Sequence, residues 1–190
     1  MPTFLALLTQ HGVNAIADVR SQPYSRLHGQ FNRETLAEAL RCAGVRYVFL
    51  GRELGARRSE RESYNGKQAR YDLIAQLPAF RDGLDRLRRG LATHRVAMLC
   101  AEKDPITCHR TVLVCRQLRR DPISIQHILA GGSIETTEQA ELRLLATVGV
   151  PTEHLFMDRA ALIEQAYDLQ AERIAYTEAE DPSAASGETA

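Results

Sequence analysis

The sequence has no apolar run that approaches the ~20 residues needed for a membrane-spanning helix. Its first residues lack the basic flank and small-residue cleavage site of a secretory signal. The formal net charge at pH 7 is zero, so overall charge demands no polyanionic partner. Four cysteines in 190 residues are too few and too scattered for a disulfide scaffold. These absences predict a cytoplasmic protein with no membrane partner, whose cysteines are free thiols, metal ligands or reactive groups.

Lysine is nearly absent as well. Lys67 and Lys103 are the only lysines among 24 basic residues, and the others are arginines. A GC-rich genome explains this bias, and we take that as its main cause. Arginine is also suited to bidentate capture of phosphate or carboxylate. The positions of the arginines, rather than their number, therefore decide whether they serve a function.

What the sequence contains is the composition of a globular domain, 44% hydrophobic and 25% charged. Short apolar segments predict strands at 13–20, 45–50, 95–100 and 123–129. Helices are predicted from Phe4, after Asn32, and over about 78–91, 107–120, 136–147 and 158–172. Alternation of this kind is typical of a parallel sheet with helical crossovers. We predict one three-layer α/β domain over residues 1–176, with a mostly parallel sheet of about four to five strands flanked by helices.

Two segments do not fit this alternation. Residues 51–70 are polar and rich in both signs of charge, which indicates a binding loop or a disordered segment. Residues 177–190 are acidic and small, and we predict a disordered tail there.

Polar residues follow the predicted strands where each strand ends. In an open parallel sheet, ligands bind beyond the carboxyl ends of the strands. All three of the first exits carry a basic residue beside a carboxylate. The candidates at these exits are Asp18, Arg20, Ser25, Arg26, Arg52, Glu102, Lys103 and Asp104.

The third exit, residues 100–110, is the densest. Pro105 suits the first turn of a helix, with Asp104 or Thr107 as its cap. His109 and Arg110 then fall at the positive end of the helix dipole, a mismatch of about 0.3–1 kcal/mol per charge. Something negative should offset them. The internal candidates are Glu102, Asp104 and Asp18, and the external one is a bound anion on the free backbone N–H groups.

Cys108 has two further interpretations. A thiol at a helix N-terminus beside histidine and arginine is the environment that exposes a thiolate. Activation by His109 is weakly supported, because neighbouring helical residues point roughly 100° apart. Zinc is the second option, with Cys100, Cys108 and His109 as ligands and Asp18 or Glu102 completing the set. Their spacing matches no common zinc motif, so we rank an anion site above a metal site and assign no metal ligand.

The remaining cysteines and one histidine have structural interpretations. Cys42 and Cys115 lie on predicted helices among apolar neighbours and are expected in the core. His127 lies inside a predicted strand and is expected to be packed rather than catalytic.

These observations favour an enzyme that acts on a phosphorylated or otherwise anionic small molecule, a nucleotide or a nucleic-acid base. The candidate catalytic residues are Asp18, Glu102, Asp104, Cys108 and His109. The candidate anion-binding and substrate-binding residues are Arg20, Ser25, Arg26, Arg52, Lys103 and Arg110. Two alternatives remain open: a non-catalytic nucleic-acid or ligand-binding module that grips through residues 52–70, and a metal-dependent hydrolase with Cys, His and Asp ligands. The reaction class, the cofactor and the oligomeric state stay open.

The same residues resemble a known family. The motifs are Asp18-Val19-Arg20-Ser21-x-Pro23-x-Ser25-Arg26, Gly44-Val45-Arg46-Tyr47, Leu54-Gly55 and Cys100-Ala101-Glu102-x-Asp104-Pro105-x-x-Cys108-His109-Arg110. Over residues 3 to about 130 they resemble the domain of unknown function 488 (DUF488) family, in a longer form with a C-terminal helical extension. The resemblance implies an α/β domain of bacterial and archaeal type whose activity is not established, and it marks the motif residues as the family signature.

The resemblance also reveals two departures. Family members begin with a short strand, whereas here a helix is predicted almost from Met1. We expect a misassigned start codon or a shortened chain to account for this, and one strand of the sheet to be unformed. The family's Leu-Gly-Gly is Leu54-Gly55-Ala56 here, a mild change.

Overall fold

The computed structural model describes residues 1–178. The α-helices are α1 Pro2–Gln10, α2 Arg33–Cys42, α3 Gly51–Leu54, α4 Tyr71–Ile74, α5 Pro78–Leu91, α6 Arg116–Leu118, α7 Thr137–Val148 and α8 Arg159–Ile174. The strands are β1 Ala15–Asp18, β2 Arg46–Phe49, β3 Tyr64–Asn65, β4 Gln68–Ala69, β5 Val96–Leu99, β6 Gln126–Ile128 and β7 Ile134–Thr136. Three 3₁₀ turns are η1 Gly29–Phe31, η2 Arg61–Ser63 and η3 Pro105–Thr107, and η4 Arg110–Cys115 is a π-helical turn.

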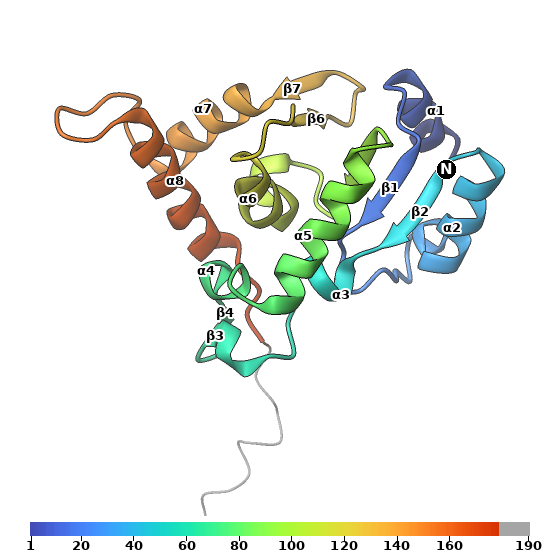
Figure 1. Cartoon of the computed structure of the whole chain (residues 1–190), viewed down its shortest axis with the longest axis horizontal. Coiled ribbons are helices and arrows are strands. Elements are labelled where there is room, and N and C mark those ends of the chain that lie inside the picture. The colour runs from blue at the N-terminus through green and yellow to red at the C-terminus, as the bar shows by residue number, and fades with distance from the viewer. Residues whose placement is uncertain (179–190) are drawn as a thin grey trace, which may run out of the picture.

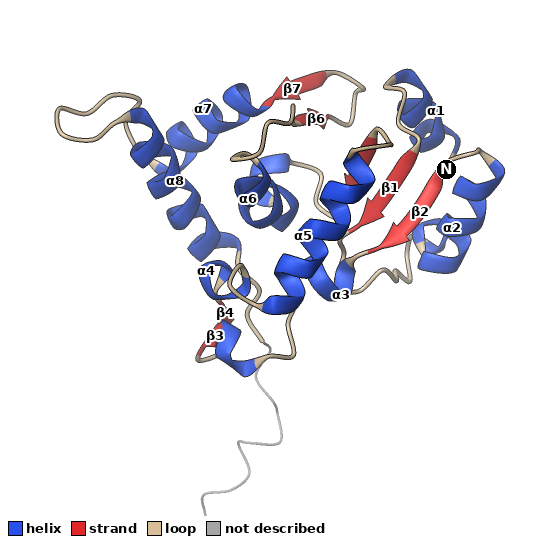
Figure 2. Cartoon of the chain, viewed as in Figure 1, coloured by secondary structure: helices blue, strands red, loops and turns tan. Residues whose placement is uncertain are grey.

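A parallel sheet of three strands, in the order β2-β1-β5, forms the centre of the fold. Figure 2 shows the strands in red with helices around them. Ala15 of β1 lies between Arg46 of β2 and Val96 of β5, so the three strands end at the same edge. The prediction of an α/β fold with a parallel sheet flanked by helices is confirmed, with three strands rather than four to five.

The fourth predicted strand, 123–129, does not join this sheet. Its central part, β6, pairs antiparallel with β7 and forms a separate two-stranded sheet. A short turn brings β7 back, in which Leu129 N donates to Ser133 O and Gly132 has a left-handed backbone with φ 85°. Only glycine adopts that conformation easily, so the turn favours this local pairing over one with β5.

The two faces of the central sheet pack against different helices. Ile16 of β1 lies in an apolar cluster with leucines of α1 and α2. Its neighbour Ala17 and the following Val19 lie in the larger core, with side chains of α5, η4, α7 and α8. In Figure 1, α1 and α2 lie on one side of the sheet and α5 and α6 on the other, with α7 and α8 beyond them. Because side chains alternate along a strand, Asp18, two residues after Ile16, lies on the same face of the sheet as Ile16.

Residues 51–70, predicted to be a binding loop or disordered, contain short regular elements. The helix α3, the turn η2 and the β3–β4 hairpin lie in this range. The Arg58 side chain lies against Glu60 at 2.6 Å and is nearly buried. Thr177 pairs with Gln68 of the hairpin, and Glu178 forms an ion pair with Arg61. The rest of the predicted tail, 179–190, lies outside the described residues.

Several local predictions can be compared directly with the structure. The helix predicted at about 78–91 is α5, and Gly44 follows α2 in the left-handed conformation with φ 72°. Cys115 is buried as expected, whereas Cys42, expected in the core, is exposed. Among residues 1–178, none of the helices has the length and apolarity needed to cross a bilayer.

Gly51, where the chain leaves β2 and enters α3, has no room for a side chain. A Cβ atom there would lie 2.0 Å from the carbonyl oxygen of Arg20 and 2.6 Å from the ring of Phe49. We expect Gly51→Ala to lower the free energy of unfolding by about 1–3 kcal/mol, because the backbone must shift to relieve the overlap. Denaturant unfolding monitored by circular dichroism measures the change.

Gly131→Ala is the matched control, since a Cβ atom at Gly131 meets nothing within 4 Å. An unfolding free energy for Gly51→Ala equal to that of the control would contradict the close approach of the two exits.

Candidate functional site

The segment that follows β5 folds in three short steps. Asp104 caps η3 by accepting a hydrogen bond from Ile106 N at 3.2 Å. Cys108, four residues after Asp104, has an extended backbone. The helical turn η4 begins after His109. The helix predicted from Thr107 to Arg120 is thus interrupted, and Cys108 precedes its first turn instead of lying in it. π-Helical turns such as η4 are rare in proteins, and those that occur are often found at functional sites.

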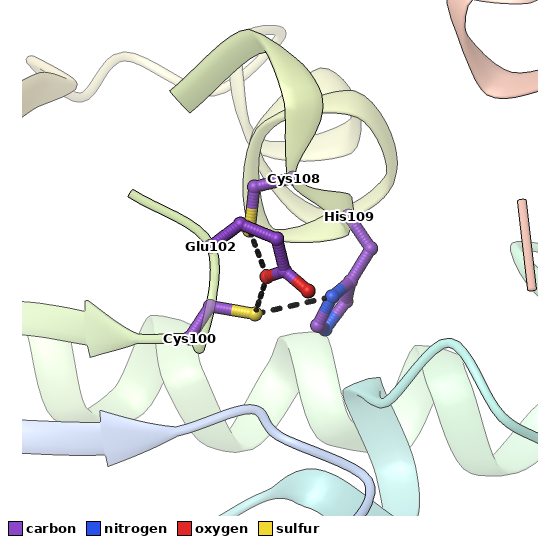
Figure 3. Close-up of side chains that lie close together, drawn as sticks. All are labelled: Cys100, Glu102, Cys108 and His109. Carbon is purple, nitrogen blue, oxygen red and sulfur yellow. Dashed lines mark hydrogen bonds between the residues drawn. The ribbon is translucent and has the colours of Figure 1, made fainter. Parts of the chain in front are cut away.

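Four side chains converge at the carboxyl end of β5 (Figure 3). The Glu102 carboxylate oxygen Oε2 accepts hydrogen bonds from the thiols of Cys100 (2.7 Å) and Cys108 (3.1 Å). The Cys100 sulfur also lies 3.3 Å from Nδ1 of His109. One donor atom from each of the four residues lies within 4.8 Å of all the others, so the group could hold a metal ion. We call these four residues the thiol cluster.

The orientation of His109 is set by the exit of β1. Its Nε2 atom lies 3.0 Å from the carbonyl oxygen of Val19. A carbonyl only accepts hydrogen bonds, so Nε2 carries the hydrogen and Nδ1 faces the sulfur of Cys100. Sequence reasoning considered His109 as the activator of Cys108, its neighbour. The structure pairs its ring with Cys100 instead, because the extended backbone at Cys108 turns that thiol toward Glu102.

The members of the thiol cluster differ in their exposure to solvent. Cys108 and His109 are buried, Cys100 is half-buried, and Glu102 is the exposed member. Cys108 also accepts a hydrogen bond from the backbone N–H of Arg110 at 3.4 Å, so its sulfur caps the start of η4. A thiolate at this position would be stabilised by that N–H group and by the helix dipole.

Hydrogen bonding and burial shift the acidities within the thiol cluster. The hydrogen bond with Cys108, together with burial, raises the pKa of the Cys100 thiol. Burial acts to raise the pKa of Glu102, but the hydrogen bonds from Cys100 and Cys108 outweigh it and hold that pKa below its usual range. Glu102 is therefore a carboxylate at neutral pH, with thiol donors beside it. Tyr71 lies close by, and burial is the main cause that raises its pKa.

Asp18, a predicted catalytic residue, lies outside the thiol cluster. Its carboxylate is fully buried and accepts hydrogen bonds from Arg20 (2.9 and 2.6 Å) and from the hydroxyl of Tyr47 (2.7 Å). Arg20 also donates to the carbonyl oxygen of Phe31. Asp18 shares the sheet face of Ile16, whereas Cys100 packs with the core on the opposite face. Asp18 and Arg20 therefore satisfy each other and anchor the loop that follows β1.

Asp104, also a predicted catalytic residue, connects the η3 turn to α7. Arg143 of α7 binds it bidentately, with both distances 2.8 Å, and also binds Glu135. The hydrogen bonds from Arg143 are the main cause that holds the pKa of Asp104 below its usual range. From α8, Gln170 donates to the carbonyl oxygen of Ile106 at 2.7 Å. These two contacts, which sequence reasoning did not identify, hold the segment that precedes Cys108.

The other predicted binding residues are spread over the surface. Arg26, Arg52 and Lys103 are exposed. The Ser25 backbone N–H donates to Asn32, and its hydroxyl accepts from His28 N, so Ser25 shapes its own loop. Of these residues only Lys103 adjoins the thiol cluster in sequence, through Glu102.

Arg110 lines a groove of about 560 Å³ between β5 and residues 123–128. Its Nε atom is buried and has no hydrogen-bond partner within residues 1–178. Within the described part of the chain, no aspartate or glutamate lines the groove. The basic and imidazole side chains that do are His11, His94, Arg95, Arg110 and His127. The groove thus offers a basic, partly apolar surface. Arg110, which lines it, directly follows His109 of the thiol cluster in the chain.

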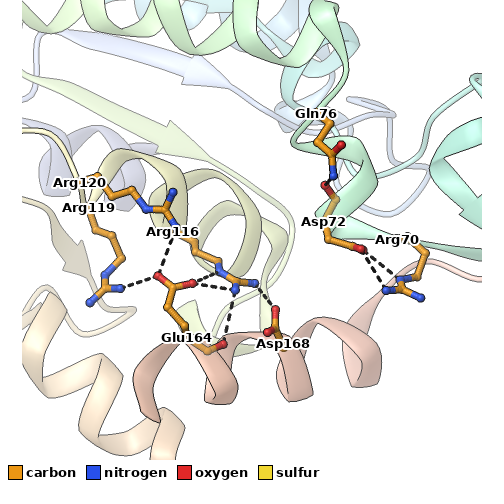
Figure 4. A network of polar contacts seen from close by, with 8 residues as sticks. All are labelled: Arg70, Asp72, Gln76, Arg116, Arg119, Arg120, Glu164 and Asp168. Atoms are coloured by element: carbon orange, nitrogen blue, oxygen red, sulfur yellow. Dashed lines mark hydrogen bonds and ion pairs between the residues drawn. The ribbon is translucent and has the colours of Figure 1, made fainter. Parts of the chain in front are cut away.

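Several arginines outside the groove are paired within the protein. Figure 4 shows Glu164 of α8 among Arg116, Arg119 and Arg120. Arg116 lies 2.7 Å from Glu164 and also 2.7 Å from Asp168. These ion pairs attach α8 to the helical segment that follows the thiol cluster, so this part of the arginine surplus serves packing.

Fold and site together define an α/β domain with a thiol, carboxylate and imidazole centre at the carboxyl end of a parallel sheet. Residues 1–116 match the family described as Domain of unknown function DUF488. The chain belongs to this family, and all four members of the thiol cluster lie in the matched part. Comparison with curated proteins and with solved structures gives no match.

His127, in the strand β6, supplies a pH-dependent term in stability. Burial is the main cause that lowers its pKa to about 4, from an ordinary value of 6.5. The charged groups that also act on it are Arg110, Glu135, Arg143 and Asp104. The folded chain then binds the proton more weakly than the unfolded chain does, so this contribution is present above pH 6.5 and is lost as pH falls through 4. Its full size is roughly 3 kcal/mol.

We expect His127→Gln to reduce the loss of unfolding free energy between pH 6.5 and pH 4, measured by urea unfolding at several pH values. His28→Gln, at an exposed histidine, is the control and should keep the slope of the unmodified chain. Equal slopes for both variants would show that His127 titrates normally.

Proposed function

We propose that this DUF488 protein is an enzyme that acts on an anionic small molecule, such as a phosphorylated compound or a nucleotide, or on a nucleic-acid base. The reaction centre is the thiol cluster. The observation that carries the proposal is the convergence of two thiols, a carboxylate and an imidazole at the carboxyl end of β5. This edge of a parallel sheet is where open α/β folds bind ligands.

The geometry favours Cys100 over Cys108 as the reacting thiol, and the raised pKa of Cys100 means that it needs His109 beside it as a base. Cys100 is half-buried, whereas Cys108 is buried and its sulfur caps η4. Nucleophilic centres require a base beside the nucleophile and a third group that orients the base. The Cys100 sulfur lies 3.3 Å from Nδ1 of His109, and Nε2 of the same ring lies 3.0 Å from the carbonyl oxygen of Val19. The nucleophile, the base and the orienting group are therefore all present. Glu102, the exposed member, is placed to exchange protons with a substrate.

Arg110 is the best candidate for binding the anion. A buried guanidinium nitrogen without an acceptor costs free energy, which a ligand oxygen would recover. The groove beside it is lined by basic and imidazole groups, with no carboxylate among the described residues of the lining. Lys103 adds an exposed positive charge next to Glu102. Arg20 is less suited to this role, because Asp18 and a backbone carbonyl already accept its hydrogen bonds.

The alternative of a non-catalytic nucleic-acid-binding module has weaker support. It relies on the arginines of residues 52–70, several of which contact acceptors in the protein itself. Arg58 binds Glu60, Arg61 binds Glu178 and Arg70 binds Asp72. The metal-dependent alternative uses the thiol cluster itself.

Arg110→Met tests the anion-binding role. We expect phosphate or nucleoside monophosphates to raise the melting temperature of the unmodified chain, because a ligand that binds only the folded state stabilises it. The variant should bind the same anion about 10- to 100-fold more weakly, the loss that accompanies removal of a charged hydrogen bond. Thermal-shift screening followed by isothermal titration calorimetry measures both effects.

Arg89→Met is the control, since Arg89 is an exposed arginine on α5 outside the groove lining. If no anion stabilises the chain, or if the Arg110 variant binds as tightly as the control, the proposed substrate class is wrong.

A further inference from the structure

The thiol cluster brings together groups that are all ligands for a cation. Each of the four residues offers one lone-pair atom, and every pair of these atoms lies within 4.8 Å. Three of the four residues, two cysteines and a glutamate, are negatively charged when deprotonated. Anionic ligands gather in a largely buried site when a cation offsets their charge.

With a neutral His109 ring, the metal-free cluster has one hydrogen too few for its contacts. The Cys100 sulfur lies within hydrogen-bond distance of both Glu102 Oε2 and His109 Nδ1, but a thiol has one hydrogen. In the neutral ring Nδ1 carries only a lone pair, because the hydrogen is on Nε2 facing Val19. Glu102 Oε2 already accepts from both thiols. A metal ion at the centre would satisfy the sulfur, nitrogen and oxygen lone pairs together.

We propose that Cys100, Glu102, Cys108 and His109 form a binding site for a zinc ion. Zinc is four-coordinate in most protein sites and takes thiolate, imidazole and carboxylate ligands, which are the donors present here. Two thiolates favour zinc over magnesium or calcium, which prefer oxygen ligands. Binding releases the two thiol protons, and the thiolates balance the charge of the ion.

Contacts outside the four donors have the form that metal sites require. A metal-binding histidine commonly donates its second ring N–H to a carbonyl or carboxylate, which fixes the tautomer. His109 does so to Val19 O at 3.0 Å. The Arg110 backbone N–H lies 3.4 Å from the Cys108 sulfur, where it would stabilise a thiolate. Glu102 is exposed, which gives the ion a path from solvent and leaves one ligand that a substrate could displace.

The zinc site deepens the proposed function. It rests on that function only in taking the thiol cluster as the reaction centre. With zinc bound, Cys100 and His109 would be ligands and would no longer act as nucleophile and base. The ion would then polarise a bound substrate or activate water, as catalytic zinc does. The ion can be sought without a substrate, so the two proposals can fail separately.

Metal analysis of the full chain, purified without chelators, is the first test. We expect about one zinc ion per chain. Replacement of zinc by cobalt(II) should give the ultraviolet charge-transfer band of cobalt–thiolate bonds and the intense visible bands of a tetrahedral ion. Competition with a chelator of known affinity then gives the dissociation constant.

The variants Cys108→Ser and Cys100→Ser each remove one thiolate. We expect each to weaken cobalt binding by more than about tenfold and to reduce the charge-transfer band. Glu102→Gln changes an exposed residue, and it keeps the site testable if a buried variant does not fold. It should weaken binding but retain the thiolate band. Cys115→Ala, at a buried cysteine outside the cluster, and Cys42→Ser, at the exposed one, are the controls and should bind as the unmodified chain does.

Three results would overturn the zinc site. The first is a folded chain that binds neither zinc nor cobalt at micromolar concentration. The second is unchanged affinity in both cluster cysteine variants. The third is a Cys100–Cys108 disulfide, found by mass spectrometry, in protein purified under reducing conditions. A chain that holds zinc but binds no anion would instead contradict the proposed substrate class, and Arg110→Met with normal zinc content would separate the two sites.

Discussion

One hydrogen bond organises the carboxyl end of the central sheet, the contact of His109 Nε2 with the carbonyl oxygen of Val19. It joins two segments 90 residues apart, the exit of β1 and the start of η4. Without it the imidazole could rotate, and Nδ1 would no longer face the Cys100 sulfur. The acceptor is a backbone atom, whose position follows from the parallel pairing of β1 with β5. The sheet register therefore sets the geometry of the thiol cluster directly.

Much of the fold could be predicted because it depends on local patterns. Pro78 at the start of α5 and the buried leucines along it define that helix almost without tertiary information. The apolar runs around β1, β2 and β5 likewise predicted strands of the central sheet. The prediction that the segment 123–129 joins this sheet was wrong, because an apolar run does not specify which strand it pairs with. The turn at Gly132 decided that β6 pairs with β7.

The site was predictable in part for the same reason. Glu102, Cys108 and His109 were chosen because they follow β5 within ten residues, and the structure brings them together with Cys100, which was weighed as a zinc ligand. Strand alternation applied to Asp18 would have placed it on the face of Ile16, away from the cluster. No local pattern could reveal that Arg143 binds Asp104 or that Gln170 binds Ile106, because these contacts join segments 39 and 64 residues apart.

Those two contacts give the C-terminal helices a role beyond covering the core. The donors of the thiol cluster lie in residues 100–109, within the family match, whereas Arg143 and Gln170 lie beyond residue 116. Both hold the short segment between Glu102 and Cys108, so the separation of the donors depends on where α7 and α8 sit. A shift of either helix would be transmitted mechanically to the cluster. The helices beyond residue 116 thus help to fix the spacing of four ligand atoms to which they contribute none themselves.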